Sequence, residues 1–345
     1  MSTGKRRTAL IGLGMVVDSH AASLRDLSDR VEVAYAFSPT AARREAFAER
    51  FAFPTCDSLE TILADDSVDS VIVLTPPNTH LDIVRRCAEA GKHVLLEKPL
   101  EITTARATEL VEICERAGVA LGIVLQHRFR PAGEVLAERL REGRLGAIAG
   151  CSTGIRLWRP QRYYDEPGRG SFARDGGGVL LTQGIHTLDM MLSLTGPVAE
   201  VRGFATTSPL HRMETEDMVT AAVRYANGAL GVIDATTAAY PGYPERIEMI
   251  GEKGSAVISG TSLTLAYHDG STETVAPDAA TKGTGANPMD FPYRWHRAVL
   301  ADFFDALDEG RAPRVTGREA LRAHRLIDAL IEAGSAGGGV AVAGD

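Results

Sequence analysis

The segment DGGGVLLTQGIHTLDMML, residues 175–192, places one titratable side chain inside an apolar stretch. Three glycines precede a pattern typical of an apolar helix, and His186 lies in the middle of it. A histidine has an ordinary pKa of about 6.5, close to neutral pH, so His186 is a candidate to accept or donate a proton. At about 100° per residue, Thr182, His186 and Asp189 would project within about 60° of one another. We therefore expect Asp189 to hydrogen-bond the His186 ring and fix its tautomer.

The composition limits what kind of protein can carry this segment. A chain of 345 residues with 44% hydrophobic and 24% charged residues indicates about two soluble domains with substantial cores. The formal charge of −8 argues against a nucleic-acid surface or an anionic membrane as partner. No apolar run is long enough to span a bilayer. Lys5-Arg6-Arg7 before TALIGLGMVV resembles a short signal peptide, but the α/β pattern continues without a break, which favours a first β-strand.

The four cysteines are scattered along the chain, at Cys56, Cys87, Cys114 and Cys151. No CxxC pair or accompanying histidine cluster is present, so the spacing predicts neither a zinc site nor a disulfide framework. Free thiols fit a reducing compartment, and we expect a cytoplasmic protein without a bound metal.

The first 126 residues alternate strand-like and helix-like patterns. Short apolar runs at 8–14, 31–37, 68–75, 92–97 and 119–125 read as buried strands, and amphipathic segments separate them. The helix after Thr103 or Thr104 should end at Gly118. This order predicts a doubly wound parallel sheet over residues 1–126, with ligands bound at the carboxyl ends of its strands.

Several chemically suggestive segments follow those strand ends. GLGMVVDSH, residues 12–20, can bring backbone N–H groups to a pyrophosphate, although Val17 stands where a third small residue is usual. Candidate cofactor contacts in these segments are Gly12, Gly14, Met15, Val16, Ser38, Arg43, Thr75, Pro76, Pro77, Asn78, His80, Glu97, Lys98 and Gln126. We expect a nicotinamide dinucleotide there.

The residues after the second strand bear on the choice between NAD and NADP. An Asp or Glu at this position would accept hydrogen bonds from the ribose 2′-hydroxyl of NAD. The chain instead reads Phe37-Ser38-Pro39-Thr40, followed by Arg43 and Arg44. Hydroxyls and arginines suit a 2′-phosphate, so we favour NADP, while surface arginines at a solvated helix start are the alternative.

The pattern changes after about residue 126. Residues 217–240 read as two strands around Asn227-Gly228, a strong hairpin signal, and residues 245–267 add two or three more. Two helical patterns follow at 295–310 and 318–334, and the last eleven residues look irregular. We therefore expect residues 127–345 to form an α+β domain with a mostly antiparallel open sheet.

Together these motifs resemble the Gfo/Idh/MocA superfamily of glucose–fructose oxidoreductases, inositol dehydrogenases and rhizopine-catabolism oxidoreductases. The most specific marks are GKHVLLEKPLEIT at 91–103 and GGGVLLTQGIHTLD at 176–189. Others are TPPNTH at 75–80 and the late WHRAVLADFFDAL. The resemblance implies an N-terminal Rossmann domain and a C-terminal domain that binds substrate and mediates oligomerisation, through its sheet, to a homodimer or homotetramer. It implies an NAD(P)-dependent dehydrogenase or reductase acting on a sugar, cyclitol or related polyol.

The resemblance also implies roles for individual residues. Lys98, in the EKP motif, would contact the nicotinamide side and a substrate hydroxyl, and its proline is commonly preceded by a cis bond in this family. His186 would accept or donate the hydroxyl proton. Thr182 stands where many members have an aspartate. A threonine carries no negative charge beside Lys98, so we expect it to act by hydrogen bonds and Lys98 and His186 to carry more of the proton chemistry.

Substrate contacts are expected from QHRFRP at 126–131, from RLWRPQRYYDEPGRG at 156–170, from the glycine-led segment and from the histidine that follows FPYRW. Aromatic rings can stack on a sugar face, and arginines and amides can hold its oxygens. The candidates are Arg128, Trp158, Tyr163, Tyr164, Gln183 and His296. For residues 126–131 the alternative is interdomain packing, and for residues 156–170 it is an oligomer contact.

Two other functions fit the same motifs. Some members of the superfamily are redox-assisted glycosidases, which recycle a bound cofactor and produce no net NAD(P)H. A catalytically silent nucleotide-binding sensor is the second alternative, which Thr182 favours and the presence of both Lys98 and His186 opposes.

Overall fold

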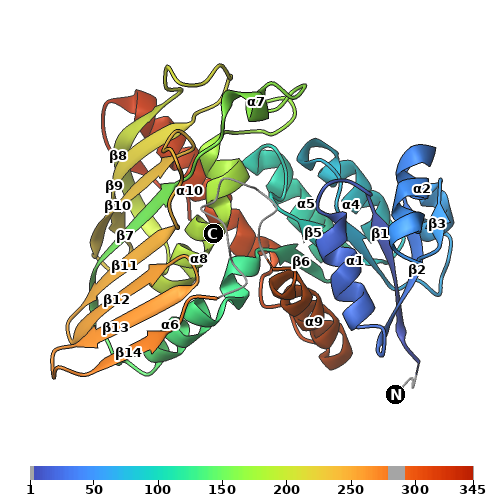
Figure 1. The fold of residues 1–345 in the computed structure, drawn as a ribbon, viewed down its shortest axis with the longest axis horizontal. Coiled ribbons are helices and arrows are strands. Elements are labelled where there is room, and N and C mark those ends of the chain that lie inside the picture. The colour runs from blue at the N-terminus through green and yellow to red at the C-terminus, as the bar shows by residue number, and fades with distance from the viewer. Residues whose placement is uncertain (1–3, 279–291, 345) are drawn as a thin grey trace. The chain divides into compact units, whose positions relative to one another are not determined.

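The computed structural model describes residues 4–278 and 292–344, which divide into two units (Figure 1). The first unit comprises Met1–Gln126 and Tyr293–Leu321, and the second comprises His127–Pro292 and Arg322–Asp345. The sequence pattern predicts one domain over residues 127–345, whereas in the structure Tyr293–Leu321 groups with the first unit.

The first unit contains a parallel sheet whose described strands run in the order β3-β2-β1-β4-β5-β6. Their bounds are β1 Arg6–Ile11, β2 Val31–Phe37, β3 Thr55–Cys56, β4 Ser70–Val73, β5 His93–Glu97 and β6 Leu121–Val124. Every residue of β4 and β6 is buried, since helices cover both faces of a doubly wound sheet. The predicted fold of this part of the chain is confirmed.

Helices of the first unit lie on both faces of the sheet. Their bounds are α1 Val17–Asp26, α2 Ala41–Arg50, α3 Leu59–Leu63, α4 His80–Glu89, α5 Thr104–Ala117 and α9 Arg294–Glu309, with a short 3-10 turn, η1, at Pro77–Thr79. Helix α1 packs against α9, and α4 against α5 (Figure 1). The side chain of Thr103 accepts the N–H of Arg106, and Gly118 ends α5 with a φ of 67°, as the sequence predicts.

Backbone pairing explains why the late segment joins the first unit. The N–H of Ile123 donates to Val315 O at 3.0 Å, and Gly122 forms a β-bridge with Thr316. Arg30, just before β2, pairs with Asp305 of α9 at 2.6 Å. These contacts join residues far apart in the sequence.

The second unit is built on a mostly antiparallel sheet, ordered β14-β13-β12-β11-β7-β10-β9-β8-β15 in the described residues. The bounds are β7 Ile148–Arg156, β8 Val198–Thr206, β9 Met218–Tyr225, β10 Leu230–Thr236, β11 Arg246–Gly251, β12 Gly254–Ser259, β13 Ser262–Tyr267, β14 Thr272–Val275 and β15 Val340–Ala341. Strands β7 and β10 pair in parallel. The Asn227-Gly228 hairpin joins β9 to β10 as predicted.

Helices of the second unit gather on one face of this sheet, where α6 and α8 pack (Figure 1). The helical elements are η2 Gln126–Phe129, α6 Pro131–Arg141, α7 Gln161–Tyr164, η3 Leu180–Gly184, α8 Ile185–Thr195 and α10 Gly317–Ala336, of which η2 and α10 each contain a boundary between the units. Among the described residues, no helix combines the length and apolar character needed to cross a membrane. All four cysteines are free thiols.

Candidate active site

The loop after β1 requires glycine at its first position. Gly12 has a φ of +105°, and a Cβ there would lie 3.0 Å from the carbonyl carbon of Leu74 and from the nitrogen of Thr75. Its N–H donates to Phe37 O at 2.9 Å. The loop after β1 therefore packs directly against the chain that leaves β4, as expected when parallel strands end at one edge.

The same loop leaves a helix N-terminus open to a ligand. A Cβ at Gly14 would meet nothing within 4 Å, and the side chain of Met15 is 61% exposed. Helix α1 begins at Val17 after Val16, which makes no side-chain capping bond. First-turn N–H groups without a side-chain cap attract a phosphate, so these residues fit a dinucleotide.

The loop after β2 is organised around Ser38, whose side chain is buried. Its hydroxyl accepts the N–H of Thr40 at 3.3 Å, and its carbonyl accepts Nη1 of Arg44 at 2.6 Å. Arg43 lies beside it with an exposed side chain. Two cationic side chains therefore follow β2, and none of residues 37–44 is an acid.

His80 ties the loop after β4 to the loop after β5. Its Nε2 lies 2.8 Å from Thr75 O, and its Nδ1 lies 3.1 Å from Pro99 O and 3.2 Å from Leu100 O. The ring is fully buried. His80 therefore holds the two loops together. The cofactor contacts expected of His80, Thr75, Pro76, Pro77 and Asn78 stay predictions.

Lys98 follows β5 directly. Its backbone N–H donates to Oε2 of Glu97 at 3.0 Å, and the Lys98–Pro99 peptide bond is cis, as the family resemblance implies. Gln126 follows β6 and is buried. The predicted cofactor residues thus come from the carboxyl ends of β1, β2, β4, β5 and β6, while their contacts with a cofactor stay predictions.

In the second unit, the glycine-led segment is not the regular α-helix that the sequence predicts. Residues Leu180–Gly184 form a single π-helical turn, η3, and only then does α8 begin. The hydroxyl of Thr182 lies 2.6 Å from Gly178 O and 2.5 Å from Oε1 of Gln183. An angle of 100° per residue therefore does not apply between Thr182 and His186. Such π turns occur frequently at functional sites.

A buried carboxylate holds the start of this turn. Glu216 accepts the N–H of Gly178 through Oε2 at 2.9 Å and the N–H of Leu180 through Oε1 at 3.1 Å. Its own carbonyl accepts the N–H of Val179 at 2.9 Å. Burial raises the pKa of Glu216 above its ordinary value, although the bonded N–H groups oppose the shift. The sequence analysis did not identify Glu216, since nothing local marks a carboxylate that bonds a segment 36 residues away.

His186 and Asp189 each have a clear neighbour within the second unit. The ring of His186 stacks on that of His127, with centroids 4.8 Å apart and planes at 28°. Asp189 is buried, and its two carboxylate oxygens accept Nε and Nη2 of Arg128 at 2.8 and 2.6 Å. The paired side chains fix each other, while the catalytic role of Asp189 and the substrate role of Arg128 stay predictions. The sequence places His127 with Gln126 and Arg128 among the residues expected to face a cleft, but it does not predict the stacking of His127 on His186.

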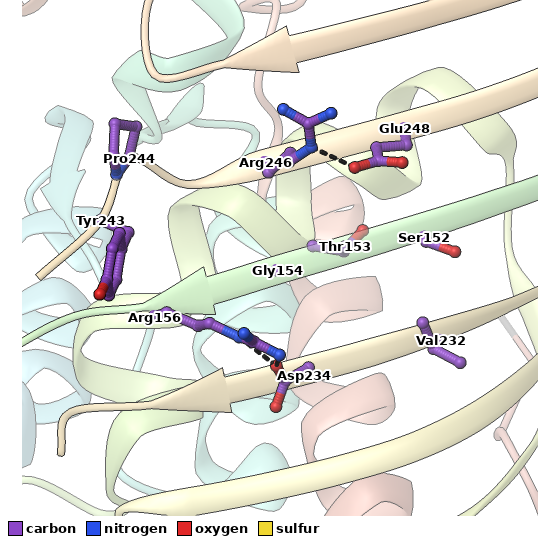
Figure 2. Close-up of a pocket in the computed structure, with 10 residues that line it drawn as sticks. All are labelled: Ser152, Thr153, Gly154, Arg156, Val232, Asp234, Tyr243, Pro244, Arg246 and Glu248. Carbon is purple, nitrogen blue, oxygen red and sulfur yellow. Dashed lines mark hydrogen bonds and ion pairs between the residues drawn. The ribbon is translucent and has the colours of Figure 1, made fainter. Parts of the chain in front are cut away.

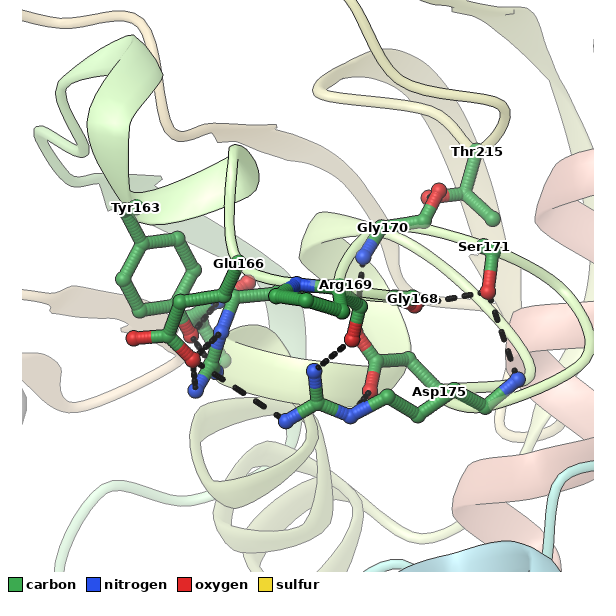
Figure 3. Close-up of polar contacts among 11 residues, drawn as sticks. Tyr163, Glu166, Gly168, Arg169, Gly170, Ser171, Asp175 and Thr215 are labelled. Atoms are coloured by element: carbon green, nitrogen blue, oxygen red, sulfur yellow. Dashed lines mark hydrogen bonds and ion pairs between the residues drawn. The ribbon is translucent and has the colours of Figure 1, made fainter.

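Tyr163 belongs to a polar cluster shown in Figure 3. Its hydroxyl accepts Nη1 of Arg169 at 2.8 Å and Nε2 of Gln183 at 3.3 Å. The Arg169 guanidinium also lies 4.3 Å from the ring centroid and pairs with Glu166 at 2.7 Å. Because the oxygen accepts two N–H groups, the phenol proton remains to be donated outward. Arg169 was not predicted.

The other predicted substrate residues have structural contacts of their own. The hydroxyl of Tyr164 lies 2.7 Å from Oγ1 of Thr237, and the ring of Trp158 meets Tyr240 edge-on with centroids 5.5 Å apart. His296 lies on α9, buried, with Nε2 3.9 Å from Oε1 of Glu97. Their contacts with a substrate stay predictions.

A hollow of about 420 Å³ lies on the second unit's sheet, and none of its lining residues is a predicted site residue (Figure 2). It is lined by β7, β10, β11 and the chain before β11. Arg156 pairs with Asp234 and Arg246 with Glu248 across its floor. We assign no chemistry to this hollow.

Comparisons with known proteins define the class to which this fold and these motifs belong. Residues 6–124 match the model of the oxidoreductase family with an NAD-binding Rossmann fold, and residues 134–257 match the GFO/IDH/MocA C-terminal domain. The protein is an NAD(P)-dependent dehydrogenase. The chain belongs to the Gfo/Idh/MocA family, as the motifs predict.

Individual relatives cover most or all of the chain. Myo-inositol 2-dehydrogenase of Thermotoga maritima is 32% identical over 72% of this chain and 73% of its own length. D-xylose 1-dehydrogenase (NADP(+)) 2 of Haloferax volcanii is 28% identical over 99% of each chain. Among solved structures, the WlbA dehydrogenase of Chromobacterium violaceum, in complex with NADH and UDP-GlcNAcA, is 28% identical with a TM-score of 0.85, covering 100% of this chain and 98% of the other.

The contact between Glu216 and the glycine-led turn predicts that Gly178 tolerates no side chain. A Cβ at Gly178 would lie 1.7 Å from Glu216 O, so Gly178→Ala must displace the turn. We expect a loss of roughly 1–3 kcal/mol of stability and a loss of turnover, measured by thermal unfolding and by nicotinamide absorbance. Gly338→Ala is the control, because a Cβ there meets nothing within 4 Å. Equal unfolding temperatures for the two variants would contradict this account of the turn.

Proposed function

We propose that the protein transfers a hydride between a nicotinamide cofactor and a hydroxyl-bearing carbon of a sugar, cyclitol or related polyol. The observation that carries this proposal is Lys98, held by its backbone N–H at the carboxyl end of β5 in an NAD-binding Rossmann sheet. Relatives named as inositol and xylose dehydrogenases support the substrate class.

The proposed chemistry divides between two side chains. An alcohol holds its proton tightly at neutral pH, so a base must remove it as the carbonyl forms. We assign that proton to His186, and to the Lys98 ammonium the stabilisation of negative charge on the same oxygen. The bound nicotinamide supplies the hydride acceptor or donor. Thr182, with Gln183 and Tyr163, offers hydrogen bonds to the hydroxyls of the ring in place of a carboxylate.

Replacement of Lys98 tests the proposal directly. We expect Lys98→Ala to lower turnover by roughly 100-fold or more while leaving cofactor affinity nearly unchanged, because the charge beside the reacting oxygen is lost and the other proposed dinucleotide contacts remain. Turnover is read by nicotinamide absorbance against a panel of cyclitols, aldoses, uronates and sugar lactones. Cofactor affinity is read by fluorescence titration.

The matched control is Lys253→Ala, since Lys253 is exposed and its ammonium donates to Gly143 O at 3.3 Å, at a loop to which we assign no chemistry. Wild-type turnover in Lys98→Ala would refute the role of Lys98. Combining Lys98→Arg with His186→Gln tests whether both act on one step, because losses in a shared step are non-additive. Glycoside cleavage without net NAD(P)H formation would favour the redox-assisted glycosidase instead.

We further propose that NADP is the preferred cofactor. The loop after β2 offers Arg43 and Arg44 and the backbone held around Ser38, and residues 37–44 contain no carboxylate to bind a ribose 2′-hydroxyl. A guanidinium suits a 2′-phosphate, which carries up to two negative charges. The names of relatives include both NADP(+) and NADH.

The cofactor proposal predicts the effect of removing one arginine. Arg43→Ala should weaken NADPH binding by about tenfold and change NADH binding by less than twofold, because only NADPH carries the 2′-phosphate. Both affinities come from parallel fluorescence titrations. Tighter binding of NADH than of NADPH by the wild-type protein would overturn the preference.

A homodimer or homotetramer formed through the second unit's sheet is a further part of the proposal. The face that bears the hollow of Figure 2 exposes large apolar side chains, with Phe204 79%, Leu230 61% and Ile250 62% exposed. Leu230 and Ile250 both pair in register with Gly150 of β7, so they lie on one row across the sheet. Exposed apolar groups gathered in this way are typical of an interface.

Charge placed on this face should separate the subunits. We expect Ile250→Asp to lower the molar mass measured by light scattering, because a buried unpaired carboxylate is strongly unfavourable. Leu210→Asp is the control, at a loop residue that is 60% exposed. An unchanged mass for Ile250→Asp, or a monomeric wild-type protein, would contradict this interface. The four free cysteines support our proposal of a cytoplasmic location.

A further inference from the structure

A fully enclosed set of three side chains lies beside Lys98 in the first unit, and the proposed mechanism does not use it. Glu97 ends β5, His20 lies on α1 and His296 lies on α9. Their exposed fractions are 7%, 0% and 1%. Burying a carboxylate is costly unless hydrogen bonds compensate it, so its partners indicate what it does.

Glu97 uses its two oxygens for different partners. Oε1 accepts Nε2–H of His20 at 2.9 Å, and Oε2 accepts the backbone N–H of Lys98 at 3.0 Å. The Glu97 carboxylate therefore links helix α1 to the backbone of Lys98, the residue to which we assign charge stabilisation.

The charge state of the set follows from its surroundings. Burial raises the pKa of Glu97, but the hydrogen bond and the attraction of His20 outweigh it, so that the pKa lies below its usual range. Glu97 is thus a carboxylate at neutral pH. Burial, then the neighbouring His20, lowers the pKa of His296 to about 3, so His296 is neutral there.

His296 restricts how the His20 ring can lie. The two rings meet edge-on, with centroids 5.2 Å apart and planes at 80°, and Nε2 of His296 lies 3.9 Å from Oε1 of Glu97. The titratable groups whose charges lower the pKa of this carboxylate are His20, His296 and Lys98. With the ring so packed, His20 presents Nε2 to Glu97 and holds the carboxylate in the orientation that Lys98 N–H requires.

We propose that His20 is a positioning residue for Lys98, acting through the Glu97 carboxylate that it orients. The inference rests on the proposed role of Lys98. Loss of the His20 donor leaves a buried carboxylate short of one hydrogen bond, and the carboxylate then rotates or takes up a proton. Either change releases the backbone N–H of Lys98 and displaces the ammonium, and small displacements of a reacting group lower the rate steeply.

The test compares two replacements of one ring. His20→Phe keeps an aromatic ring and removes the donor, whereas His20→Gln returns an amide N–H near the position of Nε2. We expect His20→Phe to lower kcat at least about tenfold, with less than a twofold change in NADPH affinity, and His20→Gln to recover most of the loss. His93→Phe is the matched control, because His93 begins the same strand and its ring accepts the Ala120 N–H rather than contacting Glu97.

A second measurement separates this inference from the proposed function. In a Lys98→Arg background, which keeps the charge but misplaces it, His20→Phe should lower kcat by less than threefold, since the two residues act in series. Wild-type kcat in His20→Phe, equal losses in His20→Phe and His20→Gln, or full additivity with Lys98→Arg would each overturn the positioning role. Wild-type turnover in Lys98→Ala would instead defeat the proposed function.

The same three side chains have donor atoms within 4.8 Å of one another, a spacing that a cation can also use. Elemental analysis of the purified protein therefore belongs to the test. One equivalent of a divalent metal, lost in His20→Phe, would overturn the positioning role in favour of a metal site. Absence of metal together with rescue by His20→Gln supports it.

Discussion

Buried carboxylates that accept backbone N–H groups organise both units of this protein. Glu97 holds the N–H of Lys98 at the end of β5, and Glu216 holds those of Gly178 and Leu180 at the start of the π turn. A carboxylate can accept several hydrogen bonds, and burying it without them strongly destabilises the folded protein. Each one therefore fixes the local backbone more firmly than a neutral acceptor would. In each unit the fixed segment adjoins a side chain to which we assign chemistry.

The first unit combines this constraint with parallel-sheet geometry. Parallel strands end at one edge, so Gly12, the loop after β4 and Lys98 come from neighbouring strand ends without long connections. His80 joins two of these loops through their carbonyl oxygens. The open N-terminus of α1 then offers N–H groups that fit a phosphate.

The second unit holds its polar residues by a different arrangement. A π turn precedes α8, and within it the hydroxyl of Thr182 contacts Gly178 O and the side chain of Gln183. Gln183 reaches Tyr163, which Arg169 also holds. The neutral side chain of Thr182, with its hydrogen bonds, thereby stands where the family resemblance implies a carboxylate in many members. This arrangement is compatible with a catalytic family member that carries threonine at position 182.

Local sequence patterns predict five of the six described strands of the Rossmann sheet, the Asn227-Gly228 hairpin, the cap and stop of α5 and the family, but not the short strand β3 at Thr55–Cys56. Those features depend on local periodicity, on turn residues and on short motifs, all of which lie within a few residues of one another. The tertiary structure alone decided that Tyr293–Leu321 joins the first unit and that β15 pairs with β8 through Val340 and Val201. It also decided the partners of Glu97 and Glu216 and the π turn at Leu180–Gly184. These features depend on contacts between residues far apart in the chain, where the energy of a buried hydrogen bond overrides what local sequence prefers.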